Sequence, residues 1–149
     1  MKVVKIIQWD MGHRVLNHRS VCKGLHGHRY RAEICFKGNL VAEEGSSEEG
    51  MVVDFSDIKK LALSLIQDKL DHGFMVWDQD EELMNFFQSS EGHKPVFVPF
   101  TPTAENVAKF IFDQLDGKLQ DIYGTGLQLH SVKLWETPSS CAIFTRKML

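Results

Sequence analysis

The feature that most constrains the fold of this chain is the alternation of apolar and polar side chains between His26 and Gly38. The apolar positions are Tyr30, Ala32, Ile34 and Phe36, and the positions between and beside them carry Arg29, Arg31, Glu33 and Lys37. A period of two predicts a half-buried β-strand. His26 and His28 share the parity of the apolar set, so both imidazoles are expected on one face, two residues apart along the strand.

A thiol and two further imidazoles lie close upstream of this strand, at Cys22, His13 and His18. Three imidazoles can hold a zinc ion and leave its fourth position open, which is the pattern of a catalytic site. His13, His26 and His28 are the candidates for these ligands. The thiol of Cys22 would then be free to act as an acid, base or nucleophile, with its pKa lowered by a nearby cation.

Two alternatives to this hypothesis remain open at the level of sequence. Cys22 can itself be a ligand, and four protein ligands would close the site and make it structural. Cys22 can also be a plain buried thiol. His18 stands between Asn17 and Arg19 with no pattern around it that indicates a ligand.

Length and composition predict one globular domain over residues 1–149, with 43% hydrophobic and 25% charged residues. The first fifteen residues lack the apolar core of a signal peptide, and no stretch is apolar enough to cross a membrane. Three widely spaced cysteines do not resemble a disulfide framework. They favour a reducing cytoplasm as the location.

The charge is unevenly distributed along the chain. A net charge of −3 argues against nucleic-acid binding. Residues 1–40 nevertheless contain eight Lys and Arg against two acidic residues, a net of +6, so the remaining residues carry −9. A basic region around the histidines suits an anionic, phosphorylated substrate. The alternative is a solvated basic face.

The order of expected elements is two strands and a short third one, two helices, and two final strands. The expected strands are Val3–Gln8, His26–Gly38, Met51–Phe55, Leu127–Glu136 and Cys141–Thr145, and the expected helices are Asp57–Leu70 and Ala104–Leu119. Asp71–Pro102 is expected to be irregular, with a short helix at Glu81–Phe87. Within it, Asp78–Lys94 is either a lid or a loop that contacts a neighbour. Strand pairs with helices grouped between them indicate an α+β fold.

Two further places suggest chemistry. Asp71 and His72 follow the first helix. An imidazole that is oriented by a carboxylate is a common general acid or base. The alternative is that the pair has no catalytic role, since Asp and His are common after helices. Glu136 has the parity of the apolar positions Val132 and Leu134. A carboxylate on a buried face must be paired. It can accept hydrogen bonds from the N–H groups of a pterin or guanine. The alternatives are an ion pair with an arginine, or a strand that simply ends at this residue.

Six short motifs in order resemble the 6-pyruvoyltetrahydropterin synthase superfamily across essentially the whole chain. They are Gly12-His13, Cys22-x3-His26-Gly27-His28, Gly50-Met51-Val52-Val53-Asp54-Phe55, Leu70-Asp71-His72, Pro102-Thr103-Ala104-Glu105-Asn106 and Glu136-Thr137. The three residues between Cys22 and the His-Gly-His motif are similar to the bacterial 6-carboxytetrahydropterin synthase branch of the queuosine pathway.

The resemblance implies a tunnelling fold, in which a four-stranded antiparallel sheet carries two helices on one face. It implies assembly into a barrel, commonly a homohexamer of two stacked trimers, with active sites between subunits. His13, His26 and His28 would bind zinc, and Cys22 would be the general base. Asp71 with His72 would relay protons, and Glu136 would anchor the pterin with help from Thr103 and Glu105.

The implied reaction is the zinc-dependent conversion of 7,8-dihydroneopterin triphosphate to 6-carboxy-5,6,7,8-tetrahydropterin, acetaldehyde and triphosphate. The alternatives are triphosphate elimination without side-chain cleavage, as in 6-pyruvoyltetrahydropterin synthase proper, and a non-catalytic oligomeric module with a structural zinc. The chain departs from the family at Gly73-Phe74-Met75-Val76, where the family often continues x-x-Leu-Asn. It departs again at Trp9-Asp10-Met11-Gly12-His13, where Ala-Ala-His is more usual.

Overall fold

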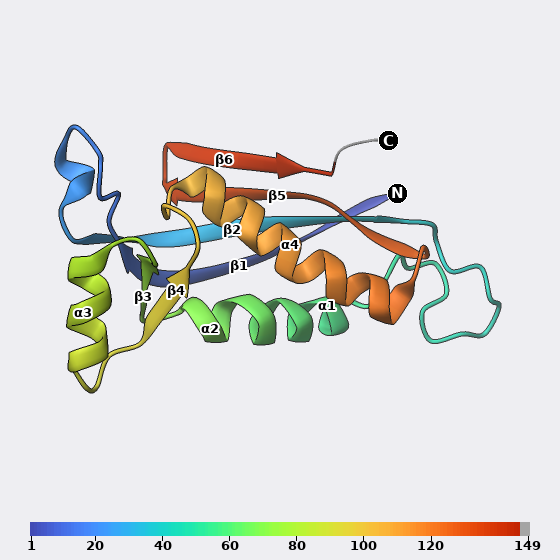
Figure 1. Cartoon of the computed structure of the whole chain (residues 1–149). Helices are drawn as coiled ribbons and strands as arrows, with labels where there is room; N and C mark the ends of the chain where they lie inside the picture. Colours follow the sequence, from blue (N-terminus) through green and yellow to red (C-terminus); the bar gives the residue numbers. More distant parts are fainter. Residues whose placement is uncertain (147–149) are drawn as a thin grey trace.

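The computed structural model describes residues 1–146, which form a curled six-stranded sheet with helices packed on one face (Figure 1). The strands are β1 (Lys2–His13), β2 (His26–Gly38), β3 (Gly73–Trp77), β4 (Pro95–Val98), β5 (Leu127–Thr137) and β6 (Ser140–Thr145). The helical elements are η1 (Val21–Lys23), α1 (Phe55–Ala62), η2 (Leu63–Gln67), α2 (Asp68–Leu70), α3 (Glu81–Ser89) and α4 (Ala104–Tyr123). The predicted α+β class is therefore confirmed.

The centre of the sheet is the long antiparallel pair of β1 and β2. Their register places Lys2 opposite Lys37 at one end and His13 opposite His26 at the other. β2 has the predicted bounds, whereas β1 runs five residues beyond the predicted Val3–Gln8 because Trp9 and Met11 continue its buried face. β5 pairs with β2, and β6 pairs with β5, both antiparallel.

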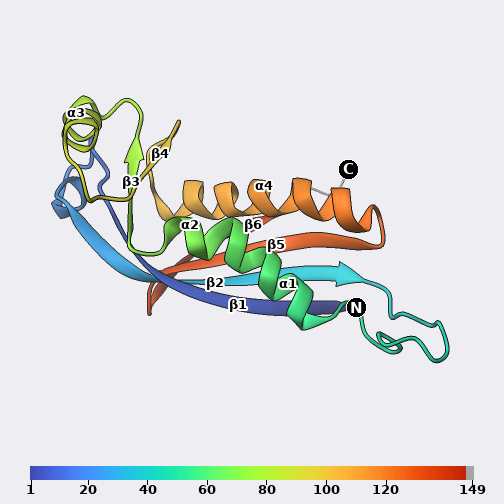
Figure 2. The same ribbon diagram turned by 90° about the horizontal axis from the view of Figure 1, so that it is seen from below.

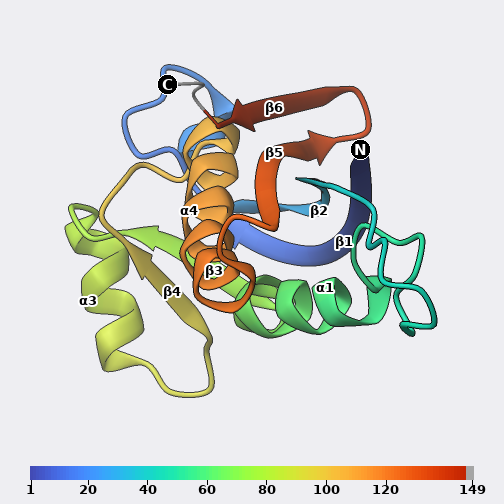
Figure 3. The same ribbon diagram turned by 90° about the vertical axis from the view of Figure 1, so that its right-hand side faces the viewer.

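The core lies between the buried face of these strands and the helices. Tyr30, Ala32, Ile34 and Phe36 on β2 are fully buried, as their alternation predicts. α1, η2 and α2 follow one another as a nearly continuous helix, which runs beside α4 along the sheet (Figure 2). Seen along the strands, β6, β5, β2 and β1 curve around these helices (Figure 3). None of the helices in the described part of the chain is long and apolar enough to cross a membrane.

The prediction of a four-stranded antiparallel sheet is wrong in two respects. The sheet has six strands, and two of them lie in parallel pairs. The strand order is β4-β3-β1-β2-β5-β6, and β3 and β4 are parallel to their neighbours. Both additional strands lie in the segment that was expected to be irregular. They are four or five residues long, and β3 pairs with β1 only at Met11–His13, so tertiary contacts rather than a repeating pattern define them.

The predicted third strand at Met51–Phe55 is also wrong. Met51 closes the acidic loop through backbone hydrogen bonds with Val41 and Glu48, and the next residues turn into α1. Val52 and Val53 pack against the core from this turn, which explains their apolar character without a strand. Asp54 caps α1 by accepting a hydrogen bond from the backbone N–H of Ser56.

The short helix predicted at Glu81–Phe87 is present as α3 and is two residues longer. It stands at the end of the molecule where β1 and β3 end (Figure 1). Phe87 of α3 packs against Phe74 of β3, with ring centroids 5.5 Å apart. The buried ion pair between Arg14 and Asp80 ties the end of β1 to the start of this helix.

Candidate metal centre and substrate cavity

Three imidazoles meet where β1 ends and β2 begins. The cross-strand pairs Met11–His28 and His13–His26 put the three rings on one face. The His13 ring centroid is 4.5 Å from that of His26 and 5.3 Å from that of His28, and the last two are 5.1 Å apart. One nitrogen of each ring lies within 4.8 Å of the others.

Backbone carbonyls orient two of the rings. The Nδ1 atom of His13 lies 2.7 Å from the carbonyl oxygen of Pro102, and that of His26 lies 2.8 Å from the carbonyl oxygen of Gly24. Because a carbonyl only accepts, Nδ1 carries the hydrogen in each ring and Nε2 keeps its lone pair. Carbonyl partners of this kind are typical of histidines that bind metals.

The surroundings of His13 favour the neutral form of its imidazole. His13 is 1% exposed. Burial lowers the pKa of His13 below its ordinary value of 6.5, and this outweighs the opposing effect of the Pro102 hydrogen bond. A neutral imidazole is the form that binds a metal. With His26 and His28, His13 supplies three nitrogen donors, a set that fits a first-row metal ion.

Cys22 lies beside this cluster and is not part of it. Among the described residues, the group that could share a metal ion consists of His13, His26 and His28. Cys22 is half-buried in the turn η1 and lines a cavity of about 250 Å³ with His13 and His26. The other residues around this cavity are Val15, His18, Thr103, Ala104, Glu105, Glu136, Ser140, Cys141 and Ala142.

Glu136 reaches into the cluster from β5. Its Oε1 lies 3.6 Å from Nε2 of His13 and 3.9 Å from Nε2 of His28. The carboxylate is half-buried and faces two imidazoles, and among residues 1–146 it forms no ion pair with an arginine. The hydroxyl of the fully buried Tyr30 also lies close to the cluster, 3.3 Å from Nε2 of His13. Burial raises the pKa of Tyr30, and the Glu136 carboxylate raises it further.

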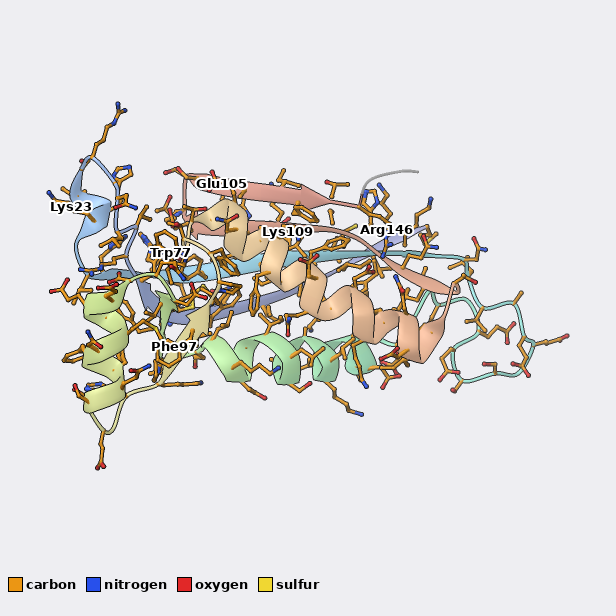
Figure 4. All side chains as sticks on the ribbon, in the orientation of Figure 1. Lys23, Trp77, Phe97, Glu105, Lys109 and Arg146 are labelled. Atoms are coloured by element: carbon orange, nitrogen blue, oxygen red, sulfur yellow. The ribbon has the colours of Figure 1, made fainter. Side chains whose placement is uncertain are left out.

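The start of α4 forms another wall of the cavity. Thr103 caps the helix by accepting a hydrogen bond from the backbone N–H of Asn106 at 3.4 Å. Glu105 follows in the first turn, beside the β5–β6 hairpin (Figure 4). Lys23, next to Cys22, marks the loop between β1 and β2 at this end of the molecule (Figure 4). The cavity thus brings together Cys22, Glu136, Thr103 and Glu105.

Asp71 and His72 form a hydrogen-bonded pair, and His72 lines cavities other than the one that Cys22 borders. Nδ1 of His72 lies 2.9 Å from Oδ2 of Asp71, and Oδ1 of Asp71 accepts a hydrogen bond from the backbone N–H of Asp10 at 3.0 Å. The Asp10 N–H lowers the pKa of Asp71 below its ordinary value, which keeps the carboxylate charged. His72 has a positive φ of 58° and an exposed side chain, which contributes to a cavity bordered by His28 but not to the one bordered by Cys22.

The sequence prediction missed three parts of this site. Tyr30 is two residues beyond His28 on the same face, so strand parity alone could have placed it below the imidazoles. The Pro102 carbonyl and the β6 wall at Cys141 come from distant parts of the chain. No local pattern predicts either of them.

Comparison with known proteins identifies the family of this chain. Residues 2–147 match the 6-pyruvoyl tetrahydropterin synthase family. The 6-carboxy-5,6,7,8-tetrahydropterin synthase of Haemophilus influenzae is 36% identical over 143 residues, which cover 93% of this chain and 94% of the relative. The protein of the same name from Aquifex aeolicus is 31% identical over 160 residues, with 95% of each chain covered.

Solved structures share the fold. An uncharacterised protein from Wolinella succinogenes superposes with a TM-score of 0.78 at 23% identity, covering 99% of this chain and 98% of its own. The 6-pyruvoyl tetrahydropterin synthase of Plasmodium vivax superposes with a TM-score of 0.70 at 17% identity, with 99% of each chain covered. With nearly its whole length matched, the chain belongs to the 6-pyruvoyl tetrahydropterin synthase family.

Proposed function

We propose that this protein is a zinc-dependent lyase that converts 7,8-dihydroneopterin triphosphate to 6-carboxy-5,6,7,8-tetrahydropterin, acetaldehyde and triphosphate, in queuosine and 7-deazaguanine biosynthesis. The observation that carries this proposal is the cavity in which Cys22 and Glu136 border two of the three clustered imidazoles. The names of two bacterial relatives, 31% and 36% identical to this chain, support 6-carboxy-5,6,7,8-tetrahydropterin as the product.

The three histidines would hold the zinc ion through Nε2 atoms, two of which the Pro102 and Gly24 carbonyls leave free. Bound zinc would supply Lewis-acid chemistry, which polarises the hydroxyl groups of the substrate side chain. Since Cys22 is outside the cluster, the protein would fill three positions and leave one for substrate.

Cys22 would act as the general base, because it borders the cavity without being held by the metal. Its thiolate would remove a proton from the substrate side chain. Glu136 would accept hydrogen bonds from the N–H groups of the pterin ring. Thr103 and Glu105, at the start of α4, would help to hold the ring. Asp71 and His72 would return protons to the ring, with the charged Asp71 fixing the orientation of the imidazole.

The division of these groups between cavities supports an assembly with shared sites. Cys22 borders one cavity, and His72 borders others. We propose that Cys22 of one copy meets His72 of a neighbour in a homohexamer of two stacked trimers. The basic residues of the first forty positions would help to hold the triphosphate of the substrate.

The test is to incubate the zinc-loaded protein with 7,8-dihydroneopterin triphosphate and to identify the products by mass, with an assay for acetaldehyde alongside. Carboxytetrahydropterin with acetaldehyde supports the proposal. Triphosphate release without acetaldehyde would replace it with the pyruvoyl reaction, and a zinc-loaded protein that converts nothing would favour a structural module. Cys22→Ala is the matched variant, which should keep zinc and lose at least about a hundredfold in turnover.

A further inference from the structure

The feature behind this inference is the buried hydroxyl of Tyr30, which lies beside the His13 ring of the three-histidine cluster. Tyr30 is 0% exposed, and its ring stacks on Trp9 with centroids 5.7 Å apart. A buried hydroxyl must have a hydrogen-bond partner. Its near neighbours are the His13 ring, with nitrogens at 3.3 and 3.4 Å, and the Glu136 carboxylate.

The chemistry of His13 limits what this hydroxyl can bond. Nδ1 of His13 already donates to the Pro102 carbonyl at 2.7 Å and has no lone pair to offer. Nε2 is a free acceptor only while no metal is bound to it. Once a metal occupies Nε2 of His13, the Glu136 carboxylate is the one neighbour of the Tyr30 hydroxyl named above that can still accept its hydrogen bond.

We propose that Tyr30 is a positioning residue whose hydroxyl is shared between Nε2 of His13 and the carboxylate of Glu136 in the metal-free protein, is given wholly to Glu136 when the metal binds, and so fixes Glu136 for recognition of the pterin ring. The inference rests on the proposed function for its ligand, but the change of hydrogen-bond acceptor does not require a pterin. Metal loading would thus prepare the organic part of the site before substrate arrives. A hydrogen bond to a charged carboxylate also holds that group more firmly than a neutral one does.

The chain offers a matched control, because its other tyrosine, Tyr123, lies at the far end of α4. Zinc-loaded wild-type, Tyr30→Phe and Tyr123→Phe proteins would be titrated with neopterin, a fluorescent pterin. Tyr30→Phe should retain its zinc and bind neopterin about tenfold more weakly, whereas Tyr123→Phe should match wild type. With the triphosphate substrate, Tyr30→Phe should raise KM more than it lowers kcat.

A spectroscopic measurement separates this inference from the proposed function. In Tyr123→Phe protein labelled with carbon-13 at tyrosine Cζ, Tyr30 gives the single resonance. Zinc should shift this resonance, and Glu136→Gln should reduce the shift. If wild type binds no neopterin but the shift is present, the proposed function fails and the acceptor change stands. If zinc produces no shift, or if Tyr30→Phe binds neopterin as wild type does, the inference is overturned.

Discussion

At the scale of single residues, the site depends on which nitrogen of each histidine is free. Carbonyls of Pro102 and Gly24 select the Nδ1–H form of His13 and His26, so Nε2 can bind a metal. Strand parity predicts that His26 and His28 share a face, and the structure agrees. Strand parity cannot predict which carbonyls orient these rings, because Pro102 is 89 residues away from His13 in the sequence.

The first prediction concerns the metal ligands. His28→Ala removes one of the three donors and should lower metal affinity enough that the purified chain retains little zinc. His18→Ala is the matched control, since His18 borders the same cavity as His13 but is outside the three-histidine group. Zinc per chain would be measured by elemental analysis after dialysis. Full zinc in His28→Ala would exclude this ligand set.

At the scale of elements, the site exists because two strands approach closely at their ends. Gly12 and Gly27 stand opposite each other in the β1–β2 register, and Gly27 separates the two histidines of β2. A Cβ atom at Gly27 would lie 2.9 Å from the carbonyl oxygen of Met11. The sequence indicates the long strands and the two main helices, because their periodic patterns extend over many residues. β3 and β4 lack such a pattern and were missed.

The second prediction tests this close approach. Gly27→Ala should destabilise the protein by about 1–3 kcal/mol, because the added methyl group forces β1 and β2 apart. Gly117→Ala is the control within α4, where a Cβ meets no atom within 4 Å. It should stabilise the protein by up to about 1 kcal/mol, since alanine favours the helix. Denaturant unfolding measures both. Equal effects from the two substitutions would contradict the β1–β2 geometry.

The third prediction concerns the ion pair that joins β1 to α3. Asp80 is 2% exposed and accepts hydrogen bonds from Arg14 at 2.5 and 2.6 Å. Asp80→Asn should lower the free energy of unfolding at pH 7 by about 3 kcal/mol, because Arg14 loses its buried partner. The neighbouring exposed Asp78→Asn is the control and should change it by less than about 0.5 kcal/mol.

The same pair has a defined pH dependence. Arg14 lowers the pKa of Asp80 below its ordinary value of 3.8. A lowered folded pKa means that the stabilisation is complete above the unfolded value and is lost as the pH falls through the folded value. The difference between wild type and Asp80→Asn should thus be full at pH 7 and shrink below about pH 4. A difference that stays constant down to pH 2 would show that the charge of Asp80 is not responsible.

At the scale of the whole molecule, the proposed catalytic groups are distributed over separate cavities. Cys22 and Glu136 face one cavity, while Asp71 fixes His72 toward others. The periodicity of the sequence could not reveal this, because it reports which face a residue occupies and not which loops meet across the molecule. The family resemblance alone suggests sites between subunits, and this division of the groups is the reason for testing them.

The fourth prediction tests shared sites by complementation. Cys22→Ala and His72→Ala chains, each inactive alone, would be co-expressed with different tags and isolated as mixed oligomers. If each site combines Cys22 of one copy with His72 of another, random assembly restores both groups in roughly a quarter of the sites. Mixed oligomers that remain inactive would show that each chain completes its own site.

The central claim is that three histidines hold the metal and that Cys22 remains free beside it. X-ray absorption spectroscopy of the zinc-loaded protein tests this claim most directly. We predict nitrogen and oxygen scatterers at about 2.0–2.1 Å with no sulfur, and an unchanged spectrum for Cys22→Ala. A sulfur scatterer at about 2.3 Å that disappears in Cys22→Ala would contradict it, since the thiol would then close the metal site.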